Sequence, residues 1–442
     1  MSLPTESLPT ESLPTASPSP ALPGPLPRPR RSAPRGLAVA QLVNSVGDGA
    51  FYVSSALYFS RVVGLTPGRI GLGLTLAWAV GAVAGVPLGH LADRRGPRGA
   101  AVALAAATSA SVAGLLFVRS YAAFLLVVVA YAVAQCGLAA ARQSLLAGLV
   151  EPGARTGVLA RLQAAGNAGI AVGAGIGAVA LHLDTPAAYL SVLALDALAF
   201  AGCAVLLGRL PRVPAGGAVV GEASGARSAT VFRDRPYALV TVLNTVMLLR
   251  MPLISLALPL WVAEHTAAPG WVVSALLVLN TGAVMLFQVR TAAGVTGLSG
   301  AVRAVRSGGA LMLAACAVFA LAGGIAAWAS LVVLVAGAVL LVWGEMRQSA
   351  GAWQISFDLA PAGRQGQYQG FFGMGMPVAR MVGPVLLTTL VIGGGVIGWL
   401  VLGVLFLGAG LAMGPAVRMA GRRAAGIAPR STGNPGGTVL EE

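Results

Sequence analysis

The sequence predicts an all-α membrane protein with twelve transmembrane helices arranged as two six-helix bundles. Hydrophobic residues make up 57% of the 442 positions and charged residues only 10%, whereas soluble domains contain about 25% charged residues. Twelve apolar runs each approach the roughly 20 residues that a helix needs to cross a bilayer. A long polar interruption divides these runs into six and six, which predicts two bundles joined by a linker.

The first 36 residues carry the repeat SLPTE, SLPTE, SLPTA and then a Pro-rich stretch that ends among arginines. Such a segment cannot bury enough apolar surface to fold. We therefore predict that residues 1–36 form a disordered cytoplasmic N-terminal tail. The first apolar run is too long for a signal peptide and lacks a small-residue cleavage site, so we expect it to remain as a helix.

The apolar runs define the elements in order. The N-terminal bundle, residues 37–208, is predicted to contain spans near 37–60, 68–90, 98–118, 121–143, 157–182 and 187–208. A cytoplasmic linker follows at 209–236. The C-terminal bundle, residues 237–420, is predicted to contain spans near 237–263, 270–290, 307–328, 330–349, 366–392 and 396–417. Residues 421–442 are predicted to form a cytoplasmic C-terminal tail.

Arginine placement predicts the orientation, because short cytoplasmic loops retain positive charge. All 29 basic residues are arginines. With the N-terminus inside, the outer loops hold only Arg61, Arg69 and Arg119, and most of the others fall in inner loops and tails. We therefore expect a multi-pass protein of the cell inner (plasma) membrane with both termini in the cytoplasm.

Two segments of the chain are similar to each other. EPGARTGVLARLQ begins at Glu151 and enters the fifth span, and APAGRQGQYQGFF begins at Ala360 and enters the eleventh. The offset covers six spans, so the two halves are predicted to be parallel repeats, as in two-bundle transporters with a central site.

Several function classes lack their sequence signals. The net charge of +15 comes from arginines scattered between apolar runs and not from one basic module, which argues against nucleic acid. There is no nucleotide-binding loop, and the cysteines have no metal-ligand or disulfide spacing. We expect no metal, no cofactor and no enzyme activity. A membrane scaffold or intramembrane enzyme remains an alternative, with His90, His182 and His265 as its best support.

A charged ten-residue segment, GHLADRRGPR at residues 89–98, separates the second and third spans. It resembles the loop between helices 2 and 3 of the major facilitator superfamily in five residues: Gly89, Asp93, Arg94, Gly96 and Arg98. WGEMRQSAGAW at 343–353 and DLAPAGRQGQYQG at 358–370 are similar to the tenth helix and following loop of bacterial multidrug efflux members. The resemblance is greatest to the drug and proton antiporter branch of that superfamily.

The resemblance implies an inner gate. In the family, the loop aspartate pairs with a basic residue on a neighbouring helix and faces the N-terminus of helix 11. Carried over, Asp93 takes that role, with Arg142 as its basic partner and the segment from Gly366 supplying the positive end of a helix dipole. The alternative is that these charges only anchor a loop at the membrane surface.

A polar stripe runs through the first span. Gln41, Asn44, Asp48 and Tyr52 recur at helical spacing and share one face, so this stripe is predicted to line a central cavity. Asp48 lies near the bilayer midplane. A carboxyl in such a place is costly and tends to face a cavity, so Asp48 is our first candidate for proton coupling. A structural hydrogen bond to Asn44 is the alternative.

Asp196 and Glu345 are the other candidate proton-coupling acids, although Glu345 could instead form a local pair with Arg347. Further polar or adaptable side chains inside predicted spans are candidate cavity residues: Tyr131, Gln135, Arg250, Thr281, Gln288, Met376 and Arg380. Arg250 and Arg380 each require an anionic partner or an anionic substrate, and Asp48 is one candidate partner for either.

Together these features predict a secondary active transporter of the major facilitator fold that works by alternating access. Its partners would be a small-molecule substrate, protons and the lipid bilayer, and we expect a monomer. The favoured function is proton-coupled export of apolar or amphipathic molecules, as in drug or natural-product efflux. A symporter or uniporter that imports a nutrient or lipid-like solute is the alternative.

Overall fold

The computed structural model describes residues 33–213, 231–361 and 363–427, and every regular element in these ranges is a helix. Eleven helices, or series of helices, are long and apolar enough to cross a membrane. A twelfth, α1 (Ala33–Leu57) with the π-helical turn η1 (Tyr58–Val62), occupies the first predicted span. Its polar stripe lowers its hydropathy. The predicted fold class is confirmed, whereas most of both predicted tails and of the linker lies outside the described residues.

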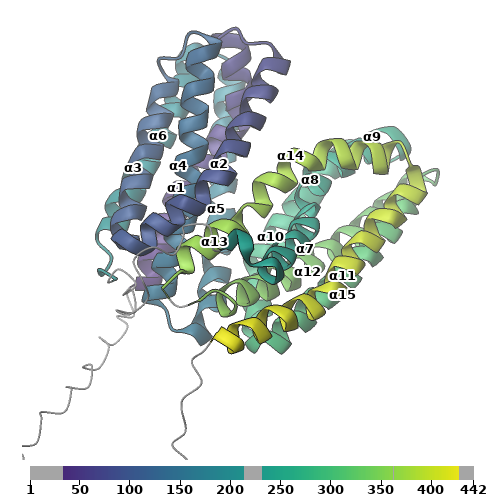
Figure 1. The fold of residues 1–442 in the computed structure, drawn as a ribbon. Coiled ribbons are helices and arrows are strands. Elements are labelled where there is room, and N and C mark those ends of the chain that lie inside the picture. The colour runs from purple at the N-terminus through teal and green to yellow at the C-terminus, as the bar shows by residue number, and fades with distance from the viewer. Residues whose placement is uncertain (1–32, 214–230, 362, 428–442) are drawn as a thin grey trace, which may run out of the picture.

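The first bundle, coloured purple to blue in Figure 1, contains α1 and five further long helices: α2 (Pro67–Arg95), α3 (Pro97–Leu115), α4 (Tyr121–Leu149), α5 (Arg155–Leu183) and α6 (Pro186–Gly208). Only Gly96 separates α2 from α3. Its φ of 98° is open to glycine and unfavourable for other residues, and Pro97 is suited to the first turn of the next helix. The GHLADRRGPR segment is therefore mostly helical, with a one-residue corner.

The second bundle also has six spans, two of which are interrupted. The first comprises α7 (Arg235–Leu248), α8 (Arg250–Pro252), η4 (Leu253–Ala257) and α9 (Leu258–His265). Three continuous helices follow: α10 (Trp271–Ala293), α11 (Gly297–Ala320) and α12 (Ala327–Asp358). The next span comprises α13 (Gln365–Gly373), α14 (Gly375–Leu387) and η5 (Thr388–Ile392), and α15 (Gly395–Ile427) completes the bundle.

One predicted span was misplaced by about one-third of its length. The apolar run 307–328 predicted the ninth span, but α11 runs from Gly297 to Ala320. Arg303 and Arg306 precede the predicted span in the sequence, yet both lie inside this helix with exposed side chains. A helix can continue beyond the apolar layer while long arginine side chains reach polar surroundings, so hydropathy marked the membrane and not the helix.

Within the first bundle, α1 and α5 pack backbone to backbone. A Cβ atom on Gly173 would lie 2.0 Å from the backbone oxygen of Val46, and one on Gly49 would lie 2.4 Å from that of Ile170. Only glycine permits this approach. The Gly-rich fifth span is thus explained by small-residue helix packing, with α1 and α5 in close backbone contact.

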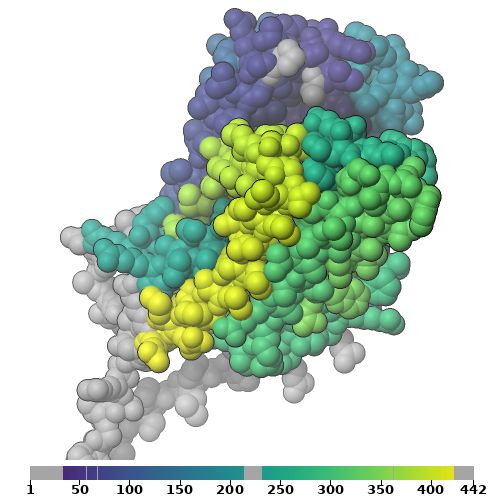
Figure 2. Space-filling view, turned by 90° about the vertical axis from the view of Figure 1, so that its right-hand side faces the viewer, coloured from purple at the N-terminus to yellow at the C-terminus, as the bar shows by residue number. Residues whose placement is uncertain are grey.

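The two bundles meet where the C-terminal part of α2 packs on α13 and where α5 packs on α10. A Cβ atom on Gly370 would lie 2.5 Å from the oxygen of Gly85, and one on Gly366 would lie 2.5 Å from that of Gly89. We call this end, residues 85–93 with 366–370, the closed end. From it the bundles diverge (Figure 1), and from the side the first bundle rises beyond the second (Figure 2).

Candidate functional site

A cavity of about 370 Å³ lies between the bundles and is lined by both. We call it the central cavity. Its wall includes most of the residues that the sequence predicted for proton coupling or cavity lining: Asp48, Tyr52, Gln135, Arg250, Gln288, Glu345, Met376 and Arg380. The fold thus brings together polar side chains that are up to 332 positions apart in the predicted spans.

Four predicted cavity residues, Gln41, Asn44, Tyr131 and Thr281, are not part of that wall. Asn44 and Tyr131 are buried behind it, where they hydrogen-bond to residues that do face the cavity. Their helix faces are partly covered by neighbouring helices, and sequence spacing does not reveal this covering. Asn44 and Tyr131 therefore support the wall instead of forming it.

The carboxylate of Asp48 lies at the centre of the polar network of the first bundle. Oδ2 accepts a hydrogen bond from Asn44 Nδ2 at 2.7 Å, and Oδ1 accepts one from Gln135 Nε2 at 3.5 Å. Gln135 also donates to Tyr131 Oη at 3.0 Å. Arg142 and Arg380 are the cations that interact electrostatically with Asp48. The Asp48 carboxyl therefore lines the cavity and lies near two arginines, whose interaction with it depends on whether it is ionised.

Asp196 on α6 is placed differently. It is 0% exposed, and neither carboxyl oxygen has a hydrogen-bond partner among the described residues. A Cβ atom on Gly47 would lie 2.4 Å from Asp196 Oδ1, so this acid packs behind α1, away from the cavity. Burying an unpartnered charge is costly, and a group enclosed in this way has no direct path to substrate.

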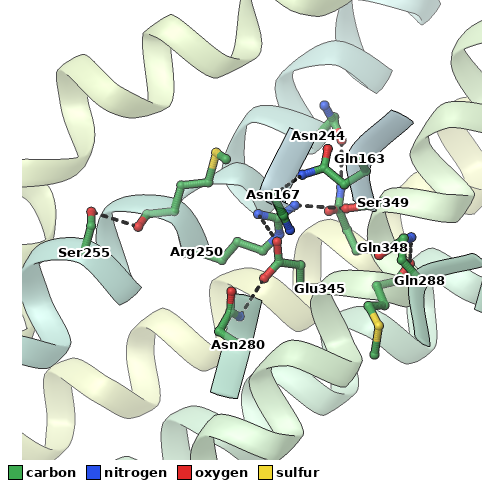
Figure 3. A network of polar contacts seen from close by, with 12 residues as sticks. Gln163, Asn167, Asn244, Arg250, Ser255, Asn280, Gln288, Glu345, Gln348 and Ser349 are labelled. Carbon is green, nitrogen blue, oxygen red and sulfur yellow. Dashed lines mark hydrogen bonds and ion pairs between the residues drawn. The ribbon is translucent and has the colours of Figure 1, made fainter. Parts of the chain in front are cut away.

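Figure 3 shows a polar cluster that lies mainly in the second bundle, together with Gln163 and Asn167 of α5. Arg250 Nη1 lies 3.4 Å from Glu345 Oε1, and Arg250 Nη2 donates to Ser349 Oγ at 3.0 Å. Asn280 Nδ2 donates to Glu345 Oε2 at 3.0 Å. Glu345 is thus paired across helices with Arg250 and not with Arg347, whose Nε donates to Ser307 Oγ at 2.6 Å. The anionic partner of Arg250 is therefore Glu345, in the same bundle.

Amide side chains extend this cluster along the cavity wall. Gln348 Nε2 donates to Asn244 Oδ1 at 2.8 Å, and Gln288 Nε2 donates to the backbone oxygen of Met346 at 3.3 Å. Of these, the sequence predicted only Gln288 as a cavity residue. Asn244 and Gln348 are polar groups inside apolar runs, and this was the signal that could have found them.

Arg380 on α14 reaches across to the first bundle. Its guanidinium lies 6.0 Å from the ring centroid of Trp78 on α2, within the range of a cation–π contact. Trp78 was not among the predicted site residues, because an aromatic residue inside a span is usually packing. Arg380 thus links the two bundles from within the cavity.

At the closed end, Asp93 binds the N-terminus of α13. Its carboxylate accepts hydrogen bonds from the backbone N–H groups of Gly366 at 2.8 Å and Gln367 at 3.0 Å, and from Ser144 Oγ at 2.8 Å. The expected pairing of Asp93 with Arg142 is wrong, since Arg142 donates to Gln41 Oε1 instead. Ser144 is the residue of α4 that contacts Asp93.

The other residues of the predicted gate segment have separate contacts. Gly89 lies against the backbone of Gly366, and Gly96 forms the corner between α2 and α3. Arg98 Nη2 donates to the backbone oxygen of Gly208 at the end of α6, whereas the side chain of Arg94 is exposed. Only part of the segment therefore takes part in the contact between bundles.

A second contact closes the same end between α5 and α12. Thr156 Oγ1 donates to Gln354 Oε1, and Gln354 Nε2 donates to Asp358 Oδ2 at 2.8 Å. α5 begins at Arg155, and Arg364 is the N-cap of α13. Each of the two repeated segments therefore begins a helix that packs against the other bundle. The sequence did not predict the Thr156–Gln354 contact.

Solved structures with similar folds are transporters. The human organic anion transporter MFSD10 (TETRAN) has a TM-score of 0.65 and 16% identity, over 88% of this chain and 100% of that one. A bacterial homologue of the iron transporter ferroportin, in an outward-facing state, has a TM-score of 0.68 and 15% identity, over 88% and 100%. The Escherichia coli fucose:proton symporter FucP has a TM-score of 0.67 and 13% identity, over 89% and 99%.

No curated protein matches the chain by sequence similarity. The family model of the Major Facilitator Superfamily, however, matches residues 37–384, which covers nearly all of the first bundle and most of the second. Together with two bundles around a central polar cavity, this match identifies the chain as a member of the Major Facilitator Superfamily, a family of membrane transporters.

Proposed function

We propose that the protein is a proton-coupled exporter of amphipathic small molecules that works by alternating access. The observation that carries this proposal is the placement of Asp48, an ionisable group on the wall of a cavity shared by both bundles. Its proton would be taken up or lost while the cavity faces one side of the membrane. Arg380, which comes from the opposite bundle, would respond to that change of charge.

The orientation follows from the arginine distribution. Of the 29 arginines, the predicted loops at the end opposite the closed end contain only Arg61, Arg69 and Arg119. The positive-inside rule therefore favours that end as the outer one. The described conformation then corresponds to a cavity closed toward the cytoplasm by the contact of Asp93 with α13. A membrane potential supplies about 2.3 kcal/mol per charge per 100 mV, which is sufficient to bias exchange between two states.

The coupling test uses everted vesicles that contain the protein and a fluorescent pH probe. Chloramphenicol, ethidium and fusidate represent neutral, cationic and anionic amphipathic substrates. With the lumen acidified, at least one should drive proton efflux through the native chain, and Asp48→Asn should abolish this exchange. Asp196→Asn is the matched control, because it neutralises a buried acid that does not face the cavity, and coupling should persist.

Coupling that survives Asp48→Asn would contradict the assignment of the proton to this residue. Loss of coupling in Asp196→Asn alone would transfer it to the buried acid. If none of the three compounds moves protons with the native chain, proton-coupled export itself is wrong.

Import in symport with protons is the second candidate. It is favoured by the many hydrogen-bonding groups of the cavity, which would suit a polar nutrient, and one structurally similar protein is a fucose:proton symporter. The direction of net solute movement separates the two functions. Cells that lack their own pumps should lose the solute when they make an exporter and accumulate it when they make an importer.

A further inference from the structure

Acidic and basic side chains line the central cavity in equal number. Four charged side chains line it: Asp48 and Arg380 near the first bundle, and Glu345 and Arg250 in the second. Arg250 is paired with Glu345, whereas Asp48 accepts hydrogen bonds from Asn44 and Gln135 and Arg380 lies over the ring of Trp78. The two acids and the two arginines give the wall no net charge when all four are ionised. An ion that bound beside Arg250 and Glu345 would have to break their pair, which is costly in a poorly solvated site.

Uncharged polar groups, in contrast, are abundant. Seven amide side chains line the cavity: Gln135, Gln143, Gln163, Asn244, Gln288, Gln348 and Gln369. Each amide can both donate and accept hydrogen bonds. The aromatic side chains of Trp78 and Trp353 lie on the same wall and offer flat apolar surfaces.

Three buried polar atoms on this wall have unmet hydrogen bonds within the described ranges: Gln143 Oε1 on α4, Gln348 Oε1 on α12 and Arg250 Nε on α8. Gln348 is 1% exposed, and within the described ranges no donor reaches its Oε1. Arg250 is 5% exposed, and its Nε has no acceptor in the same ranges. An acceptor and a donor left unpaired in this way each favour a ligand group that completes the bond. Gln348 and Arg250 belong to the cluster of Figure 3, where two unpaired atoms lie in one bundle, whereas Gln143 is a single unpaired acceptor on α4 of the first bundle.

We propose that Asn244, Arg250, Gln288, Gln348 and Ser349 form a head-group subsite for an uncharged hydrogen-bonding group, such as a sugar hydroxyl or an amide. The substrates would then be neutral amphipathic molecules whose apolar part lies against the aromatic residues. This inference rests on the proposed transport function and defines its substrate class. It also separates the roles of the bundles, because the proton site is in the first and the head-group subsite in the second.

The test is a binding measurement on the purified full-length protein with a matched series of probes. 2-Naphthyl β-D-glucopyranoside carries a neutral head group, 2-naphthyltrimethylammonium a cation, 2-naphthoate an anion, and 2-naphthyl methyl ether no polar head group of comparable capacity. The glucoside should bind at least about tenfold more tightly than each of the others, as one to two net hydrogen bonds would provide. Equal or tighter binding of the ammonium or the carboxylate would overturn the proposal, as would a glucoside that binds no better than the ether.

Two variants locate the effect. Gln348→Leu should weaken glucoside binding about fivefold to tenfold and leave binding of the ether unchanged. Gln163→Leu removes an exposed amide of α5 that lines the same cavity but is not part of the proposed subsite, and it should change neither. Equal losses of glucoside binding in the two variants would mean that binding depends on the overall polarity of the cavity, and they would contradict a localised subsite.

The comparison of probes on the native protein needs no variant, so a poorly folded Gln348→Leu would leave the test intact. Binding is also measured without a membrane or a gradient. Failure of proton coupling would therefore not affect this result, and failure of head-group selectivity would not affect coupling.

Discussion

Asp93 on α2 accepts a hydrogen bond at 2.8 Å from the backbone N–H of Gly366, the second residue of α13. A carboxylate from one bundle thus caps a helix of the other. The interaction adds a negative charge to the positive end of a helix dipole and is shielded from solvent, since Asp93 is buried. It exists only while the bundles are together at this end, so its strength contributes directly to the balance between the two states of the transporter.

Asp93→Asn should shift this balance toward the state that opens at the closed end. The amide keeps one acceptor but loses the charge, and a bond to a charged group contributes about 1 kcal/mol more than a neutral one. The equilibrium should change by about fivefold to tenfold. Cys136 lines the cavity, whereas Cys203 and Cys316 are buried, so an impermeant maleimide applied to either membrane side reports which end is open.

In the native chain, the reagent should label Cys136 from the outer side, and in Asp93→Asn labelling from the cytoplasmic side should increase. Cys136→Ser provides the background. An Asp93→Asn protein with the native labelling pattern would show that the cap does not hold the closed end.

Gly89→Ala should prevent closure altogether. The added methyl group would lie 2.1 Å from the backbone oxygen of Gly366, and neither backbone can move away without separating α2 from α13. Transport should fall below a few per cent of native, with Cys136 labelled mainly from the cytoplasmic side. Gly99→Ala is the control, because nothing lies within 4 Å of its Cβ position. Native turnover in Gly89→Ala would contradict this close approach.

Glu345→Gln should destabilise the second bundle by about 3 kcal/mol, because it leaves Arg250 buried without its anion. Replacing both partners, with Glu345→Leu and Arg250→Met, should recover most of that loss. Thermal unfolding of the native chain, Glu345→Leu, Arg250→Met and the variant with both substitutions gives the four corners of a double-mutant cycle. Additive effects of the two single substitutions would mean that the ion pair contributes nothing to stability.

Asp184 caps α5 outside the membrane-spanning segments, in contact with Tyr189 and Arg61. The hydrogen bond from Tyr189 and then the one from Arg61 lower the pKa of the Asp184 carboxyl. Because the pKa of Asp184 is lower in the folded protein, its ionised carboxylate stabilises the fold. This stabilisation is complete above the unfolded-state pKa, about 3.9, and is lost as pH falls through the folded-state pKa.

Asp184→Asn should therefore lower the unfolding temperature at pH 7 by no more than about 2 °C, since the group is exposed. The difference should vanish under strongly acidic conditions. Asparagine also tolerates the φ of 47° at this position, so the backbone is preserved. A difference that grows as pH falls would contradict the assigned sign.

Much of this fold could be predicted because apolar runs and arginine placement are strong signals. The sequence does not reveal how each helix is rotated about its own axis, and this rotation decides which side chains face a given neighbour. Arg142 and Ser144 are two residues apart on α4, so their side chains point to nearly opposite sides of the helix, and the wrong one was expected at Asp93. In the same way, hydropathy could not distinguish Asp48, on the cavity, from Asp196, behind it. The Thr156–Gln354 contact depends on the docking of the two bundles and has no local signature.

The closest contacts at the closed end are between glycine backbones, so this part of its fit depends on the absence of side chains. Two bundles that meet in this way are exchangeable in principle. A chimera that keeps α1–α6 of this chain and takes its second half from a relative with the same glycine positions should still close. With the proton site and the head-group subsite divided between the bundles as proposed, such a hybrid would take its energy source from one parent and its substrate from the other, and new specificities could arise without a change in the driving mechanism.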